Sequence, residues 1–300
     1  MKPQAFNGVF AAALTPLRSD FSPDLDVLPS FLAFLAQRGC HGALLLGTTG
    51  EGPSFSPEQR REVYRAALEV RQEHPEFYLL AGTGTPSLDE TSALTRTAFN
   101  LCMDGVVVLP PYYFRKASDD GLFAWYHEVI QQAVPTDGAL FAYHFPGMSG
   151  VPLSLDLLAR LKDTFSNQFI GIKDSSGDPA FAEELCTRFG RDLLVFTGND
   201  SLFTFALQSK AAGCITALAN LISPDLRRIW DTFQRGQPDL KAQENVNLVR
   251  AILDRYPPAP PLLKALLTRY FGFPRWPVCP PLLPLTAETE DIVAPQLNLA

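Results

Sequence analysis

Short apolar runs alternate along the chain with stretches whose apolar residues recur at helical spacing. The runs are nearly continuous rather than alternating, which is typical of strands buried on both faces of a parallel sheet. We predict eight strands, at 9–15, 42–46, 77–82, 105–109, 140–145, 169–173, 193–197 and 214–218. Helical patterns follow them at 25–38, 57–74, 87–102, 119–133, 154–165, 179–189, 201–212 and 223–235. Eight strands, each followed by a helix, predict an α/β protein with a (β/α)8 TIM barrel.

Four helices begin with a serine suited to capping, namely Ser56, Ser87, Ser154 and Ser223, and two of these serines precede a proline. An open doubly wound sheet is the alternative fold. Such sheets often carry a Gly-rich turn after the first strand. Here that place holds Leu-Thr-Pro-Leu at 14–17, which cannot cradle a pyrophosphate, so the barrel is favoured.

The rhythm of strands and helices stops near residue 236. Two further helical patterns, 238–256 and 260–271, precede a Pro-rich tail. We therefore predict a barrel catalytic domain at 1–235 and a C-terminal helical extension at 236–300.

Composition excludes several classes of protein. The net charge is -7, from 25 Lys+Arg against 32 Asp+Glu, and such a surface disfavours nucleic acid. The five cysteines are scattered without metal-ligand spacing, so we expect no metal site and no disulfide framework. No signal-peptide pattern and no apolar run near the ~18 residues of a membrane span occurs. A cytoplasmic protein is the simplest interpretation.

Lys173 is the first candidate for chemistry. It is one of seven lysines and the only one that continues an apolar strand, Phe169–Lys173. Burial disfavours a charged ammonium, and the neutral amine is the form that attacks a carbonyl. A strand-end lysine paired with Asp174 or reaching solvent is the structural alternative.

Two further features lie at the ends of other predicted strands. Tyr143, in Tyr-His-Phe-Pro, can relay protons to and from Schiff-base intermediates, although a core tyrosine is the commoner case. The turn Gly47–Pro53, Gly-Thr-Thr-Gly-Glu-Gly-Pro, offers hydroxyl and backbone N–H groups to an anion such as a carboxylate. A plain loop is the alternative for this turn.

The three features fall on the second, fifth and sixth predicted strands, at the end where barrels hold their active sites. Together with other motifs they resemble the family of N-acetylneuraminate lyase and dihydrodipicolinate synthase, the class I pyruvate-dependent aldolases. The likeness spans essentially the whole chain. It rests on 8–10 with 15–16, then 47–51, 111–113, 143–146, 171–174, 197–200 and 280–285.

The resemblance implies a role for each residue. Lys173 would form an imine with pyruvate or a related 2-keto acid, and Tyr143 would shuttle protons. Thr48 and Thr49 would hold the keto-acid carboxylate, and Thr49 would link to Tyr143. Tyr113 resembles the tyrosine that members insert into a neighbouring subunit's site. It also implies a homotetramer, a dimer of dimers, that needs no metal or organic cofactor because the lysine supplies the electrophile.

Tyr112 adjoins Tyr113 and is the alternative for that inserted tyrosine. Further candidate substrate-binding residues are Ser149, Gly198, Asp200 and Thr216.

The chain departs from the family pattern at two places. Dihydrodipicolinate synthases carry an arginine for the carboxylate of the aldehyde partner where this chain has Met148. The lyases carry an acidic residue after the Gly-x-Asp motif, where this chain has Ser201. His144 adjoins Tyr143, but strand alternation points it away from the barrel interior, so we favour a structural role for it.

We therefore predict a Schiff-base lyase that cleaves or forms a 4-hydroxy-2-keto acid, such as a 2-keto-3-deoxy sugar acid, giving pyruvate and an aldehyde. A sugar-acid dehydratase and a dihydrodipicolinate synthase, each using the same lysine imine, are the alternatives. A keto-acid-binding barrel without catalysis is a third, and intact Lys173 and Tyr143 argue against it. The identity of the aldehyde and the physiological direction do not follow from these residues.

Overall fold

The computed structural model describes residues 6–297. Its eight parallel strands follow one another in chain order around a closed barrel, which confirms the predicted fold. The strands are β1 (Gly8–Ala12), β2 (Gly42–Leu45), β3 (Tyr78–Gly82), β4 (Gly105–Val108), β5 (Leu140–His144), β6 (Phe169–Asp174), β7 (Leu194–Thr197) and β8 (Gly213–Thr216). Nearly every strand residue is buried, as the continuous apolar runs predict.

Helices connect the strands. They are α1 (Leu28–Gln37), α2 (Pro57–Ala67), α3 (Leu88–Asn100), α4 (Asp119–Ala133), α5 (Pro146–Ser149), α6 (Leu155–Thr164), α7 (Pro179–Phe189), α8 (Phe203–Gln208), α9 (Ala219–Gln234), α10 (Leu240–Arg255), α11 (Ala259–Phe271) and α12 (Ala287–Val293). Short 3-10 turns are η2 (Gly52–Ser54), η3 (Leu68–Gln72), η4 (Asp200–Leu202) and η5 (Ala294–Gln296).

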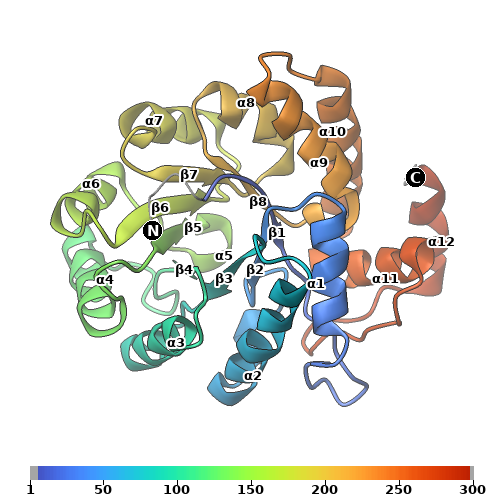
Figure 1. Cartoon of the computed structure of the whole chain (residues 1–300), viewed down its shortest axis with the longest axis horizontal. Helices are drawn as coiled ribbons and strands as arrows, with labels where there is room; N and C mark the ends of the chain where they lie inside the picture. The colour runs from blue at the N-terminus through green and yellow to red at the C-terminus, as the bar shows by residue number, and fades with distance from the viewer. Residues whose placement is uncertain (1–5, 298–300) are drawn as a thin grey trace. The chain divides into compact units, whose positions relative to one another are not determined.

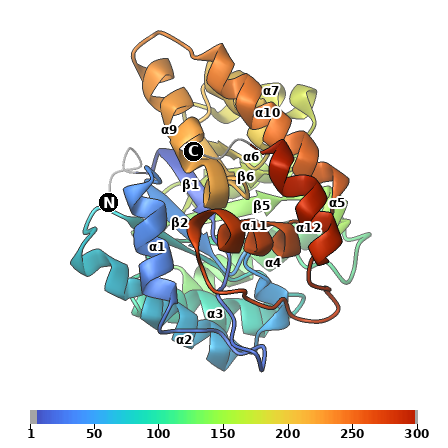
Figure 2. The same ribbon diagram turned by 90° about the vertical axis from the view of Figure 1, so that its right-hand side faces the viewer.

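The chain forms two compact units. The first comprises Tyr78–Ile215 with the segment up to Gly8, and the second comprises Val9–Phe77 and the chain from Thr216 onward. In the first unit, β3 to β8 pair in register and carry α3, α4, α6 and α7 on their outer side (Figure 1). In the second unit, α10 packs along α9 and α12 lies beside α11 (Figure 2).

Three of the four predicted serine caps are confirmed. Ser56, Ser87 and Ser154 each accept a hydrogen bond from a backbone N–H in the first turn of α2, α3 and α6. The prediction for Ser223 is wrong, because α9 already begins at Ala219 and Ser223 lies inside it. The residue before it, Ile222, is non-helical, so the helix is kinked just ahead of Pro224.

Two other differences have local causes. The first strand ends at Ala12 rather than residue 15, since the Leu14 N–H donates to the side chain of Asn220 at 3.0 Å and not to a strand. The tail contains the short helix α12, whose start is capped by Thr286. Neither the Asn220 contact nor α12 shows in the periodic pattern of apolar residues.

Candidate active site

Lys173 lies near the carboxyl end of β6, directly opposite Tyr143 of β5 in the strand register. Its Nζ stands 4.3 Å from the centre of the Tyr143 ring. Lys173 is 3% exposed and Tyr143 is 5% exposed. The amine and the phenol that the sequence singles out are therefore brought together in one buried spot of the first unit.

The next register pair, His144 and Asp174, settles which face Lys173 occupies. His144 stacks on Phe181 of α7 with ring centres 4.5 Å apart, and its Nδ1 accepts a hydrogen bond from the Leu153 N–H at 3.0 Å. His144 thus faces the helices, and alternation turns Tyr143 and Lys173 toward the inner face of the strands. Burial lowers the pKa of His144 to about 4, so it is neutral at pH 7. The predicted orientation of His144, away from the inner face of the strands, is confirmed.

An apolar layer lies on the inner face with Lys173 and Tyr143. Phe141, two residues before Tyr143, packs edge-on against Phe6 and Phe196 with ring centres 5.6 and 5.8 Å away. Phe196 is the β7 partner of Lys173 in the register. The neighbours of Lys173 on this inner face are therefore aromatic rings.

The turn after β7 lies against the chain that follows Lys173. The Gly198 N–H donates to the Asp174 carbonyl at 2.6 Å. A Cβ at Gly198 would stand 1.9 Å from the Ser175 hydroxyl, so this close approach requires glycine. Asp200, at the start of η4, is fully buried. The structure thus places Gly198 beside the end of β6.

Asp174 does not pair with Lys173, which was the structural alternative. Its carboxylate accepts hydrogen bonds from the Ser176 N–H at 3.0 Å and the Ser176 hydroxyl at 3.1 Å, and burial raises its pKa. Lys173 forms no ion pair among the described residues. The lysine is therefore buried beside a ring and not beside a carboxylate.

Ser149 and Met148 belong to the short helix α5. The Ser149 hydroxyl donates to its own turn, at 3.0 Å from the Phe145 carbonyl and 3.1 Å from the Val151 carbonyl. Met148 is 54% exposed, and a Cβ at Gly150 would touch Arg115 Cδ at 2.7 Å. Ser149 therefore holds the turn together, and its contact with substrate stays a prediction.

Tyr113 is the most exposed of the candidate residues, at 77%, and its ring packs edge-on against the equally exposed Phe114, 5.2 Å away. No residue between 6 and 297 covers this aromatic pair. Its insertion into a neighbouring subunit stays a prediction.

The turn after β2, in the second unit, holds Thr48 and Thr49. The Glu51 N–H donates to the Thr48 carbonyl at 3.2 Å, and the Thr15 hydroxyl donates to the Gly50 carbonyl at 2.7 Å. Thr49 is buried. Hydrogen bonds thus hold the backbone of the turn, and its binding of a carboxylate stays a prediction.

Thr216, at the end of β8, is also in the second unit. It is buried, and its hydroxyl has no hydrogen-bond partner among residues 6–297. A buried hydroxyl without a partner is costly unless a ligand or water satisfies it. This is a physical reason to keep Thr216 among the substrate-binding candidates.

Sequence reasoning gave no role to Lys264 in α11. Its ammonium donates to Glu51 Oε1 at 2.6 Å, and both side chains are 1% exposed. Burial lowers the pKa of Lys264, and the Glu51 carboxylate opposes this. Its position within Leu-Leu-Lys-Ala-Leu at 262–266 was the available signal, because a lysine inside an apolar helical run needs a buried partner.

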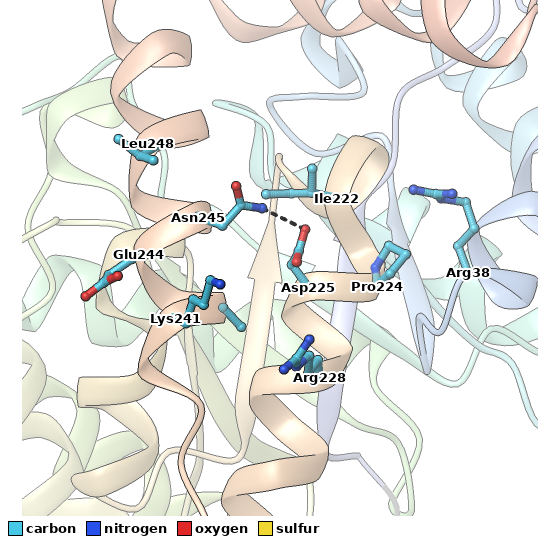
Figure 3. Close-up of a pocket in the computed structure, with 10 residues that line it drawn as sticks. Arg38, Ile222, Pro224, Asp225, Arg228, Lys241, Glu244, Asn245 and Leu248 are labelled. Carbon is cyan, nitrogen blue, oxygen red and sulfur yellow. Dashed lines mark hydrogen bonds between the residues drawn. The ribbon is translucent and has the colours of Figure 1, made fainter. Parts of the chain in front are cut away.

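The second unit also has a surface hollow of about 510 Å3 between α9 and α10 (Figure 3). Its wall mixes cations and acids: Asp225 accepts a hydrogen bond from Asn245 at 3.0 Å, and Arg228 pairs with Asp239. It contains none of the candidate residues. We interpret it as a solvated groove with locally balanced charge.

Among the described residues, no group of three His, Cys, Asp or Glu side chains could hold a metal ion. None of the described helices is long and apolar enough to cross a membrane.

A model of the dihydrodipicolinate synthetase family matches residues 5–299, which is nearly the entire chain. The chain belongs to this family. It is consequently a lyase of the class I aldolase type, a group whose members bind pyruvate and an aldehyde. The resemblance inferred from the motifs is confirmed.

Relatives in this family carry more than one name. A DapA-like lyase of Chloroflexus aurantiacus is 39% identical over 283 residues, 94% of this chain and 92% of the relative. The 4-hydroxy-tetrahydrodipicolinate synthase of Rhodospirillum centenum is 31% identical over 96% of each chain. The crystal structure of a Bacillus anthracis dihydrodipicolinate synthase superposes with a TM-score of 0.88 at 26% identity, covering 97% of each chain.

Proposed function

We propose that the protein cleaves, or in reverse forms, a 4-hydroxy-2-keto acid through an imine on Lys173, with a 2-keto-3-deoxy sugar acid as the favoured substrate class. The observation that carries the proposal is the buried Lys173 amine, 4.3 Å from the Tyr143 ring centre. Among the residues that the structure describes, Lys264 is also buried, but its Nζ is bound to the Glu51 carboxylate at 2.6 Å and to the Pro277 carbonyl at 2.7 Å. Lys173 is therefore the better nucleophile.

The chemistry follows from these groups. The Lys173 amine attacks the C2 carbonyl of the keto acid, and loss of water leaves a protonated imine. When the C4 hydroxyl loses its proton, the C3–C4 bond breaks, its electron pair moves to the iminium nitrogen, and the aldehyde leaves. The remaining enamine takes up a proton at C3, and hydrolysis of the imine releases pyruvate. Tyr143 is proposed as the group that passes these protons.

The keto-acid carboxylate is assigned to Thr48 and Thr49 by family resemblance. The geometry of their own turn supports this role, because hydrogen bonds at its Thr48 and Gly50 carbonyls hold the backbone in place. A hydroxyl pair on a fixed turn can bind a carboxylate without first being ordered.

A panel of 2-keto-3-deoxy acids tests the proposal. Cleavage releases pyruvate and an aldehyde, and coupling to lactate dehydrogenase detects the pyruvate. A dehydratase consumes the same acids without releasing pyruvate, and a barrel that only binds keto acids consumes none. Turnover without pyruvate would replace the proposed cleavage by dehydration. Binding without turnover would remove catalysis altogether.

We expect pyruvate to condense better with glyceraldehyde than with aspartate semialdehyde. The semialdehyde brings its own carboxylate, for which dihydrodipicolinate synthases use an arginine at the place of Met148. Methionine offers no donor, and an unpaired buried carboxylate costs about 2–5 kcal/mol. That corresponds to roughly 30- to several thousand-fold in catalytic efficiency. The measurement is kcat/KM for each aldehyde.

Arg115 is the cation to test beside this comparison. Its side chain lies against Gly150, which directly follows the helix α5 that carries Met148. A tenfold or greater preference for the semialdehyde would contradict the prediction. Arg115→Gln would then show whether this arginine reads the second carboxylate. The expected result is that Arg115→Gln leaves the glyceraldehyde reaction unchanged.

Exposed Tyr113 and Phe114 support a further part of the proposal, a homotetramer in which a second copy covers this aromatic pair. Light scattering gives the mass. A monomer with full activity would rule out a contribution of Tyr113 to a neighbouring site.

A further inference from the structure

Glu51 ends the turn that carries Thr48 and Thr49, and its carboxylate is bound on both oxygens by the C-terminal part of the chain. Oε1 accepts from the Lys264 ammonium at 2.6 Å, and Oε2 accepts from the Cys279 N–H at 2.7 Å. The same ammonium donates to the Pro277 carbonyl at 2.7 Å. All of these contacts lie within the second unit.

The backbone of Glu51 connects these contacts to the threonines. Its φ is +57°, a left-handed conformation that a residue with a side chain adopts only when its surroundings hold it there. Its N–H donates to the Thr48 carbonyl at 3.2 Å. A shift of the Glu51 side chain therefore moves the backbone to which Thr48 is hydrogen-bonded.

The pair is a costly way to fill a core. Two charges with 1% exposed side chains lose their hydration, and apolar residues of similar size are often as stable. An ion pair with further hydrogen bonds fixes the orientation of the carboxylate, because each of its oxygens accepts from one defined donor. The ion pair therefore adds little to the free energy of unfolding, but it fixes the position of the Glu51 carboxylate next to the turn of Thr48 and Thr49.

We infer that Glu51 and Lys264 are positioning residues that fix Thr48 and Thr49 for the carboxylate of the keto acid. This inference rests on the proposed function and goes beyond it. It makes α11 and the segment at Pro277–Cys279 part of the substrate-binding machinery, although they contribute no group to the chemistry. The C-terminal extension would then have a role in substrate binding.

The test separates binding of a carboxylate from formation of the imine. Lys264→Met removes the charge at nearly constant size, and Glu51→Gln removes the opposite charge at constant shape. The double variant Glu51→Gln/Lys264→Met leaves no unpaired charge, so it keeps the test open if either single variant fails to fold. Leu267→Ala is the matched control, because Leu267 is fully buried in the same helix and its loss destabilises without touching Glu51.

Two ketones are reduced onto the enzyme with borohydride: pyruvate, and acetone, which has no carboxylate. We expect the half-saturating pyruvate concentration to rise about 10- to 100-fold in the variants that lack a charge, because small displacements of a positioning group cost that much. Trapping by acetone should stay unchanged. Leu267→Ala should lower Tm and leave both ketones as in wild type.

The outcomes are distinguishable. If wild type traps no pyruvate at Lys173, the proposed function fails and the inference fails with it. If wild type traps pyruvate and the charge variants keep its half-saturation while Tm falls, Glu51 and Lys264 only stabilise the fold, and the inference alone is overturned. An equal loss with pyruvate and acetone would also overturn it, since the carboxylate would then play no part.

Discussion

Borohydride reduction in the presence of pyruvate is expected to attach one pyruvate-derived group to Lys173 and to stop turnover. Reduction converts the imine to a stable secondary amine, so the labelled peptide identifies the lysine that formed it. Lys173 is buried on the inner face of β6, against Tyr143 and without an ion pair among the described residues. An amine that is not bound to a carboxylate is available to attack the keto-acid carbonyl.

Lys173→Ala is expected to lose turnover by roughly 10⁴-fold or more, as covalent nucleophiles generally do when removed. It should also lose all trapping. Lys264 is the internal control, since it is equally buried but bound to Glu51 at 2.6 Å and to the Pro277 carbonyl at 2.7 Å. Label on Lys264, or turnover in Lys173→Ala, would remove the imine mechanism.

The fold was predictable because its determinants are local. Each β-strand lies in a short apolar run, and some of these runs end in polar residues, as where Phe169–Lys173 runs on into Asp174 and Ser175. The same locality identified Lys173 and Tyr143, since both terminate such runs. That they face one another follows from the register of β5 and β6, which no single run of residues reveals.

Long-range contacts account for what the sequence did not show. Glu51 and Lys264 are 213 residues apart, and only the folded chain reveals that each is the partner of the other. Asn220 is similar: its amide donates to the Ala12 carbonyl at 2.8 Å and thereby links the end of β1 to α9. For Ser149, the sequence did not show that its hydroxyl donates to carbonyls of its own turn, and its contact with substrate stays a prediction.

Tyr143→Phe is expected to lower turnover by about 10²–10⁴-fold, which is the usual contribution of a general acid–base group. The substitution keeps the ring that packs against the Lys173 amine and against Phe145, with ring centres 5.7 Å apart, so folding should be retained. Only the hydroxyl is lost. The measurement is kcat on the best acid of the panel, beside the Tm of both proteins.

His144→Asn is the matched control for the proton relay. His144 faces α7, is neutral at pH 7 because burial lowers its pKa to about 4, and already accepts a hydrogen bond from the Leu153 N–H. We expect its replacement to reduce Tm and to leave kcat within the range of wild type. Trapping by borohydride separates the steps further: Tyr143→Phe should still form some imine with pyruvate, because the attacking amine is intact, and should fail mainly when protons move during cleavage. Wild-type turnover in Tyr143→Phe, together with a large loss in His144→Asn, would assign the proton relay to His144 instead. The relay would then act from the outer face of β5, away from the Lys173 amine.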